Sequence, residues 1–529
     1  MKKKKVINFI VFSFIILFFS SLYFYSSRPQ KQMEEERITL KWYINFSWFQ
    51  TEWGQNIVSK RISEKTGVDI EFVVPKGNEK EKLQSMISSN SLPDFVTIGW
   101  WESENQELVV KEQVYALNEL DKQYQTGFMN VAKKESVRWY TNKDGNLYGY
   151  PNYSYTWNDF KKGKGKLSSN QNFLVRKDIY EAIGSPDMTT MEGFESAVKK
   201  AKEYAPFING KPLIPIGADE FTDRGNNSFD IWLQNFLAVP YEKNGIYYDR
   251  NMDTEYIKWL KLFRKLREEG YINDEVFIDN RVQLMEKLEE GRYFCLLYQN
   301  TDIEDQQKQI YNNNPEQIYI PVEGPRNSKG EDPKLPITGI QGWTLTYISK
   351  NCKNPQKAME VMAYMLSPEG KRLLCFGEKD SMYSIRDNQI IVDEKVLKLL
   401  NTNRTLYDKI YGAYDTYWML QDGNLKMNDY FQRPKYMERL YEWTHPYIIY
   451  SSQYELEFQD NQEMNYLYNG FRKLWSDTLI QLLLSNSEEE FDEIIKKYLK
   501  QREEKGYQKF VIEATKTIQK NKEKLGMEE

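Results

Sequence analysis

Short apolar runs alternate with amphipathic stretches in the first hundred residues after the N-terminal segment. Three runs have the β-branched and aromatic residues typical of strands: 38–44, 69–74 and 95–98. Between them, apolar residues recur at helical spacing in Ile57–Ile62 and Leu83–Ile87, and Gly67 is well suited to end the first helix. This β-α-β-α-β order predicts a parallel sheet covered by helices.

The rest of the chain continues to mix strands and helices. Asp144-Gly145 predicts a hairpin turn followed by a strand. Further strands are expected at 173–176, 293–298 and 343–348. Helix starts are expected at the capping boxes Thr189-x-x-Glu192 and Ser487-x-x-Glu490, and at Asn354-Pro355 and Pro368. From about residue 400 the pattern is mainly helical.

The N-terminus predicts export. Four lysines, Lys2–Lys5, precede 20 uncharged residues, Val6–Tyr25. A signal sequence usually has an apolar region of about 7–15 residues, whereas a membrane-spanning helix needs about 20. The lysines should stay cytoplasmic, which places the rest of the chain outside the cell. The pattern favours an uncleaved anchor at 1–27 with a linker at 28–37, and cleavage of a signal peptide remains the alternative.

Charge and residue counts exclude several function classes. The chain of 529 residues has 72 basic and 77 acidic side chains, unlike the strongly basic nucleic-acid binders. The single histidine, His445, excludes a site with two histidine ligands, and no G-x-S-x-G motif occurs. Cys295, Cys352 and Cys375 lack C-x-x-C spacing. We therefore expect no catalytic residues, no cofactor and no metal, and leave open whether Cys352 and Cys375 form a disulfide.

The cysteine positions also bear on anchoring. Because the first cysteine is Cys295, no lipidation cysteine follows the apolar segment, and the protein is not expected to be a lipoprotein. Aromatic residues are abundant, with 13 Trp, 38 Tyr and 27 Phe. Most should pack in cores, but aromatic rings also stack on the C–H faces of sugars, so some are candidates for a carbohydrate pocket.

Several segments, taken in order, resemble one known family. They are Thr66–Ile70, Leu83–Phe95 with its Ser91-Leu92-Pro93-Asp94, Asp144–Pro151, Leu174–Asp178, Ile348–Ala358 and Ser367–Gly370. Together they resemble the extracellular solute-binding proteins of ABC importers, in particular the family 1, Lpl-like sugar-binding group. The absence of a lipidation cysteine departs from many of these proteins and affects the expected mode of anchoring, not the expected fold.

The resemblance implies an α/β fold of the type II periplasmic-binding-protein kind. The chain is too long for one ordinary core and suits two large lobes. The resemblance implies that crossing linkers join these lobes and that they close around a ligand by a hinge motion. The crossings are expected near 150–153, 293–298 and 343–348. Lobe 1 would then comprise 38–150 and 293–345, and lobe 2 would comprise 151–292 and 346–529.

A ligand site is expected beyond the carboxyl ends of the parallel strands. Aromatic candidates lie near predicted strand ends: Trp48, Trp100, Trp101, Tyr298 and Trp343. The expected polar partners are Glu102, Asp223 and Asn300. Trp100 and Trp101 are adjacent, so in an extended backbone they point to opposite faces, and both should not enter one core.

The expected function is the capture of a carbohydrate, in particular an oligosaccharide, for an ABC importer. The implied partners are the ligand, the permease subunits and the membrane, with the protein itself a monomer at the outer face of the cell membrane. Two alternatives remain from the sequence. One is a secreted glycan-active enzyme with two positioned carboxylates, and the other is a ligand-sensing partner of a membrane receptor.

Overall fold

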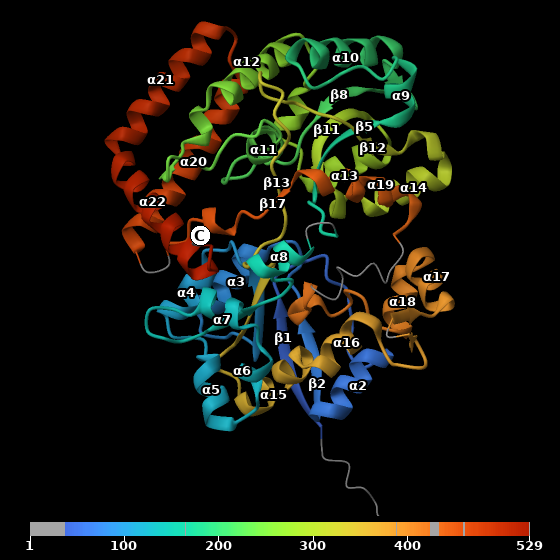
Figure 1. Ribbon diagram of the computed structural model, residues 1–529, viewed down its shortest axis with the longest axis vertical. Helices are drawn as coiled ribbons and strands as arrows, with labels where there is room; N and C mark the ends of the chain where they lie inside the picture. Colours follow the sequence, from blue (N-terminus) through green and yellow to red (C-terminus); the bar gives the residue numbers. More distant parts are fainter. Residues whose placement is uncertain (1–36, 164–165, 388, 424–432, 459–460, 528–529) are drawn as a thin grey trace, which may run out of the picture.

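Two separate sheets, each surrounded by helices, organise the protein (Figure 1). The computed structural model describes residues 37–163, 166–387, 389–423, 433–458 and 461–527. The expected membrane segment at 1–27, and its linker up to residue 36, lie outside this part of the chain. Among the described residues, no helix combines the length and the apolar character that membrane crossing requires.

The first sheet contains the predicted β-α-β-α-β unit. Its strand order is β2 (Val68–Val73), β1 (Ile38–Ile44), β3 (Phe95–Gly99), β14 (Thr344–Ile348) and β4 (Gly149–Pro151). β1 pairs in parallel with β2 and β3, which confirms the predicted parallel arrangement, and β14 runs antiparallel to β3 and β4. The carboxyl ends of β1 and β3 therefore lie at the same edge of the sheet.

Helices cover this sheet as the apolar periodicity predicts. α2 (Ile57–Thr66) ends at Gly67, whose φ of 72° is left-handed and whose N–H donates to the Ser63 carbonyl. α3 (Glu79–Ser88) buries Leu83, Met86 and Ile87. α15 (Pro355–Leu366) begins at the predicted proline, and α16 (Pro368–Phe376) follows it. Their apolar faces form one core with the sheet.

The second sheet has a core of its own. Its strand order is β12 (Tyr319–Pro321), β5 (Gln171–Arg176), β11 (Tyr293–Gln299) and β8 (Ile214–Gly217). The helices packed around it include α10 (Met191–Tyr204), α12 (Thr254–Glu268), α20 (Gln462–Leu484) and α21 (Glu488–Glu504). Figure 1 shows this half above the first, and we call the halves lobe 1, built on β1, and lobe 2, built on β5.

The expected lobe boundaries differ from these cores. Residues 293–335, assigned to lobe 1 from the sequence, belong to lobe 2 because β11 pairs with β5 and β8. Residues 346–420, assigned to lobe 2, pack in the core of lobe 1. The apolar run of β11 predicts a strand buried on both faces but carries no information on which sheet it joins.

One helix start is also displaced. α10 is capped by Thr190, whose hydroxyl accepts from the Gly193 N–H at 3.0 Å, and not by Thr189 as the capping-box pattern suggested. Thr189 instead donates its hydroxyl hydrogen to Asp187 at 2.7 Å. The prediction of Thr189 as the capping residue was therefore wrong by one position. The hydroxyl of Thr189 is used instead in a local turn with Asp187. The cap predicted at Ser487 is confirmed by its bond from the Glu490 N–H.

The segments that cross between the lobes lie side by side. β13 (Leu335–Pro336) pairs in parallel with β17 (Ile448–Ile449), and the Ser169 hydroxyl donates to the Pro336 carbonyl at 2.7 Å. Three distant parts of the chain thus meet at one narrow junction, which is the arrangement that a hinge requires.

A second connection is made by the last helix, α22 (Tyr507–Leu525). Lys522 pairs with Glu242 of lobe 2 at 2.6 Å. Two residues later, Lys524 donates to the Trp139 carbonyl of lobe 1 at 3.2 Å, and Leu525 joins the core of lobe 1. α22 therefore contacts both lobes near the junction.

The three cysteines are buried, and no disulfide joins them. Burial raises the pKa of the Cys352 thiol to about 12. The question left open by the sequence is answered: Cys352 and Cys375 do not form a disulfide in this structure.

Candidate functional site at the lobe interface

Aromatic rings collect at the carboxyl end of β1. Trp48, in the loop after β1, stacks on Trp343 with centroids 5.9 Å apart and planes 13° apart. Trp343 in turn lies 4.6 Å from Trp418, and Phe46 lies 5.1 Å from Trp343. Trp418 is buried, whereas 57% of Trp48 is exposed. The group is a supported aromatic surface with one face left open, and we call it the aromatic platform.

The structure brings two of the predicted residues, Trp48 and Trp343, into this platform. Trp418 was missed. It follows a short helical region in the sequence and carries no motif, and it reaches the platform only because η6 (Trp418–Leu420) packs beside β14. Nothing in the local sequence marks that packing.

The loop after β3 is held in one shape by Asn105. This buried side chain donates to the carbonyls of Gly99, Trp100 and Glu102 at 2.8, 3.0 and 2.8 Å. Its carbonyl oxygen accepts from the Tyr347 hydroxyl at 2.8 Å. A backbone turn whose three carbonyls share the two N–H groups of one buried amide is well ordered, so the loop can present its side chains in a defined orientation.

Trp100 and Trp101 project from this loop at right angles. Their ring centroids lie 6.3 Å apart with an 87° angle between planes, and both are partly exposed. Trp100 packs against the core of lobe 1. Trp101 covers Gly99 so closely that a Cβ there would lie 2.6 Å from the indole, which explains the glycine at the end of β3.

Glu102, the next residue, reaches across to lobe 2. Its carboxylate pairs with the Arg224 guanidinium at 3.4 Å. Burial raises the pKa of Glu102, and the charge of Arg224 opposes that shift. Asp223, the neighbouring candidate, is exposed. The structure therefore gives Glu102 a protein partner where the sequence suggested a ligand.

Two further candidates have structural roles. Tyr298 is 1% exposed and packs edge-on against Trp232 with centroids 5.8 Å apart. Asn300 is fully buried, accepting from the Asn172 amide at 2.6 Å and donating to the Leu440 carbonyl at 3.3 Å. Both side chains are engaged in packing inside lobe 2, which differs from the expected ligand contacts.

Several buried polar atoms near the junction have no hydrogen-bond partner within the described part of the chain. They include Gln341 Nε2, Thr344 Oγ1, Trp418 Nε1 and Gln453 Oε1. Because buried polar atoms are normally satisfied, these atoms require water or a ligand. The Gln341 oxygen already accepts from Ser452 at 2.8 Å, so only its amide nitrogen remains available.

Acidic groups accompany them on the lobe 2 side. Asp230 accepts from Trp475 Nε1 at 3.1 Å and from the Gln234 amide at 2.9 Å, and burial raises its pKa to about 6. Burial, together with the charge of Glu457, raises the pKa of Glu455 to about 7. Asp230, among lobe 2 partners, and Glu455 are thus two buried carboxyl groups that hold their protons to higher pH than an exposed carboxyl group does.

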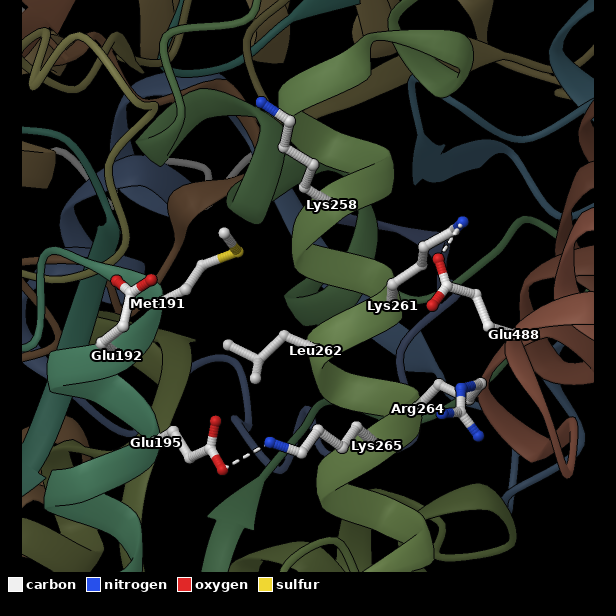
Figure 2. Close-up of a pocket in the computed structure, with 9 residues that line it drawn as sticks. All are labelled: Met191, Glu192, Glu195, Lys258, Lys261, Leu262, Arg264, Lys265 and Glu488. Carbon is white, nitrogen blue, oxygen red and sulfur yellow. Dashed lines mark hydrogen bonds and ion pairs between the residues drawn. The ribbon is translucent and has the colours of Figure 1, made fainter.

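A distinct cavity of about 290 Å³ lies outside this region, between α10 and α12 (Figure 2). Charged side chains line it, and the drawn pairs Lys261–Glu488 and Lys265–Glu195 are both 2.7 Å long. Its lysines are held by neighbouring acids, whereas Arg264 Nε on its wall has no hydrogen-bond partner among the described residues. In the part of the chain that the structure describes, no group of three or more metal-ligating side chains is found.

Comparison with known proteins decides the family. The model of the family described as bacterial extracellular solute-binding protein matches residues 58–375, more than half of the chain. The chain belongs to this family. No curated protein matches this solute-binding protein at a significant level.

Solved structures share the fold of this solute-binding protein at low sequence identity. An alginate-binding protein without calcium ion aligns with a TM-score of 0.65 and 18% identity, covering 92% of this chain and 98% of that one. A Streptococcus pneumoniae ABC-transporter substrate-binding protein, FusA, in complex with kestose aligns with a TM-score of 0.68 and 15% identity, covering 91% and 99%.

A third similar structure is an HMO-binding, ABC-transporter-associated solute-binding protein from Bifidobacterium longum infantis. It aligns with a TM-score of 0.61 and 13% identity, covering 91% of this chain and 98% of that one. At these identities the comparison shows the two-lobe α/β fold.

Proposed function

We propose that this solute-binding protein is the extracellular substrate-binding component of an ABC transporter and that it captures a carbohydrate between its lobes. The observation that carries the proposal is the aromatic platform, where Trp48 keeps 57% of its surface exposed although it is stacked on Trp343. Apolar sugar faces stack on such rings, whereas a ring required only for folding would be covered.

The polar surroundings support a hydroxyl-rich ligand. The unpartnered amide and hydroxyl groups of Gln341, Gln453 and Thr344 include both donors and acceptors. A pocket for small ligands typically combines apolar walls with a few such groups. Similar folds carry kestose in one solved structure and are named for alginate and HMO binding in others, which supports an oligosaccharide as the ligand.

The proposal is tested by a thermal-shift screen over mono-, di- and oligosaccharides, with peptides as a contrasting class. A ligand at one hundred times its dissociation constant should add about 2.7 kcal/mol to the free energy of unfolding. Calorimetry on the hits should give one site per chain. A panel in which peptides shift the melting temperature and saccharides do not would contradict the carbohydrate assignment.

We further propose binding without turnover. The family consists of binding proteins, and a solute-binding protein of an importer has to release its ligand unchanged. Chromatography of oligosaccharides after prolonged incubation with the pure protein should recover them intact. Products that accumulate in proportion to protein concentration would instead support a glycan-active enzyme.

The remaining proposals concern location and partners. We propose that residues 1–27 anchor the protein uncleaved to the outer face of the cell membrane, where it meets the permease subunits as a monomer. Full-length protein should remain in the membrane fraction after a high-salt wash, and a variant starting at residue 37 should be soluble and monomeric by light scattering. Recovery from the medium of a chain shortened at its N-terminus would argue for a cleaved signal.

A further inference from the structure

Two polar contacts join the lobes away from the junction. Glu102 of lobe 1 pairs with Arg224 of lobe 2 at 3.4 Å. One helical turn further along lobe 1, the Gln106 side-chain oxygen accepts from the Asn465 amide of α20 at 2.8 Å. Each contact has one partner on either lobe, so both exist only while the lobes are together.

Both sides of the contact are firmly held. On lobe 1, Asn105 fixes the loop that carries Glu102, and α4 (Glu104–Val110) carries Gln106. On lobe 2, the Ser476 hydroxyl of α20 donates to the Thr222 carbonyl at 2.6 Å, which ties the loop of Arg224 to the helix of Asn465. On each lobe, the residues of the two contacts are therefore held in place by the surrounding structure.

Their position makes them sensitive to a hinge motion. The Glu102 loop follows β3, and two strand spacings separate β3 from β4, the strand that leads into the first crossing. Neighbouring strands lie about 4.8 Å apart, so β3 and β4 are about 10 Å apart and the contact lies to one side of that crossing. A rotation at the junction separates Glu102 from Arg224 before it disturbs either core.

We propose that Glu102–Arg224, supported by Gln106–Asn465, is a latch that stabilises the closed arrangement of the lobes and thereby sets ligand affinity. The ligand part of this inference rests on the proposed function. A ligand that requires closure binds with an apparent affinity equal to its intrinsic affinity multiplied by the fraction of protein that is closed. Residues of the latch then control affinity without touching the ligand.

The direct test measures lobe separation without any ligand. Lys122 of lobe 1 and Lys500 on α21 have side chains 80% and 77% exposed, and the native cysteines are buried, so cysteines placed at these two positions can be labelled selectively. Spin-label distance measurements should show a longer mean separation in Glu102→Arg and in Arg224→Glu. The double exchange, Glu102→Arg together with Arg224→Glu, should restore the mean separation of the parent protein.

A matched control exchanges a pair inside one lobe. Lys65 and Glu369 pair at 3.0 Å on α2 and α16 of lobe 1. The exchange Lys65→Glu with Glu369→Lys should leave the distance distribution unchanged. Glu102→Gln, which keeps side-chain size, and Arg224→Gln, which removes the charge with a shorter side chain, should lengthen the distance less than the charge reversals. The proposal would be overturned if none of the four single latch variants changed the distance distribution. It would also be overturned if the double exchange were no closer to the parent than either charge reversal alone.

Ligand binding gives the second readout. Each single charge reversal should weaken binding of a saccharide found in the screen about two- to fivefold, the range expected for a partly exposed ion pair, mainly through faster dissociation. The double exchange should recover the parental affinity. If no saccharide binds while the distances respond as described, the proposed function fails and the latch stands; if saccharides bind and the distances do not respond, the latch fails alone.

Discussion

Trp48 and Trp343 stack with their planes 13° apart, and yet more than half of the Trp48 surface remains open. A stacked pair inside a core would be covered on every side. Here Trp343 supports one face of the Trp48 ring, and the other face is available. The protein thus holds the Trp48 ring in place and leaves much of its surface available to a ligand.

Trp48→Ala should therefore lower ligand affinity at least about tenfold, near 1.4 kcal/mol, because a stacking surface is lost. The free energy of unfolding should change little, since Trp48 is largely exposed. Calorimetric titration and denaturant unfolding measure the two quantities on the same samples. An unchanged affinity for every saccharide that the parent binds would remove the platform from the site.

Trp42 and Tyr466 provide matched controls. Trp42 is fully buried and donates its indole N–H to Thr97 at 2.8 Å. Trp42→Ala should cost about 3–5 kcal/mol of stability, as for other core tryptophans. Tyr466 is 79% exposed on α20, and Tyr466→Ala should affect neither stability nor affinity.

Replacing Trp100 and replacing Trp101 should have different effects on stability. Trp101→Ala should weaken binding at least about tenfold with little change in melting temperature, because Trp101 is partly exposed and is not among the residues of the lobe 1 core. Trp100→Ala should weaken binding to a similar extent and also lower stability, because Trp100 packs against the lobe 1 core. Normal binding by both variants would place this loop outside the ligand site.

Asn105 should be important for stability out of proportion to its size. Asn105→Ala removes the partner of the Tyr347 hydroxyl and the side-chain donor to three backbone carbonyls, of which those of Gly99 and Glu102 keep bonds from backbone N–H groups. Each buried polar group left unsatisfied costs about 1–3 kcal/mol, although some of these groups can recruit water. We expect a loss of about 2–4 kcal/mol in urea unfolding, with weaker binding because the loop of Trp100 and Trp101 is released. A loss below 1 kcal/mol would show that the loop is fixed by other contacts.

Much of lobe 1 follows from the local sequence. The strands at 38–44 and 95–98 and the helix that ends at Gly67 were predicted within a residue or two because hydrophobic period and capping are local signals. Trp48 and Trp343 were found for the same reason: each lies next to a predictable strand. Local sequence patterns predict a residue's position well where that position depends on its immediate neighbours in the chain.

The remaining site residues depend on contacts between distant segments. Arg224 meets Glu102 across 122 positions, and Trp418 meets Trp343 through a helical turn with no strand next to it. Tyr298 and Asn300 were misjudged because a strand end was taken to be open, whereas Trp232 and Leu440 cover it. Periodicity cannot reveal which segments cover a strand end, and for the same reason residues 293–335 were assigned to the wrong lobe.

Stability should depend on pH through Glu455. Its pKa is raised from 4.5 to about 7, so the folded protein retains this proton to higher pH than the unfolded chain does. The free energy of unfolding should therefore fall as pH rises from about 4.5 to about 7, by about 2–3 kcal/mol from this group. Glu455→Gln should flatten that part of the profile.

Urea unfolding of both proteins at pH 5 and pH 8 measures this difference. Asp230→Asn serves as a comparison, because its raised pKa of about 6 places its transition at lower pH. A Glu455→Gln profile parallel to that of the parent over this range would show that Glu455 titrates normally in the folded state.

The position of α22 restricts how the lobes can move. Lys522 is attached to lobe 2 through Glu242, and Lys524 is attached to lobe 1 through Trp139. These two residues are separated by about 3 Å along a rigid helix axis, so the two attachment points cannot drift apart while α22 stays in place. The β13–β17 pair fixes a second point. A rotation of one lobe about the line through these two places keeps both sets of contacts, whereas a translation of one lobe along the other breaks them. The last helix thus favours rotation over sliding.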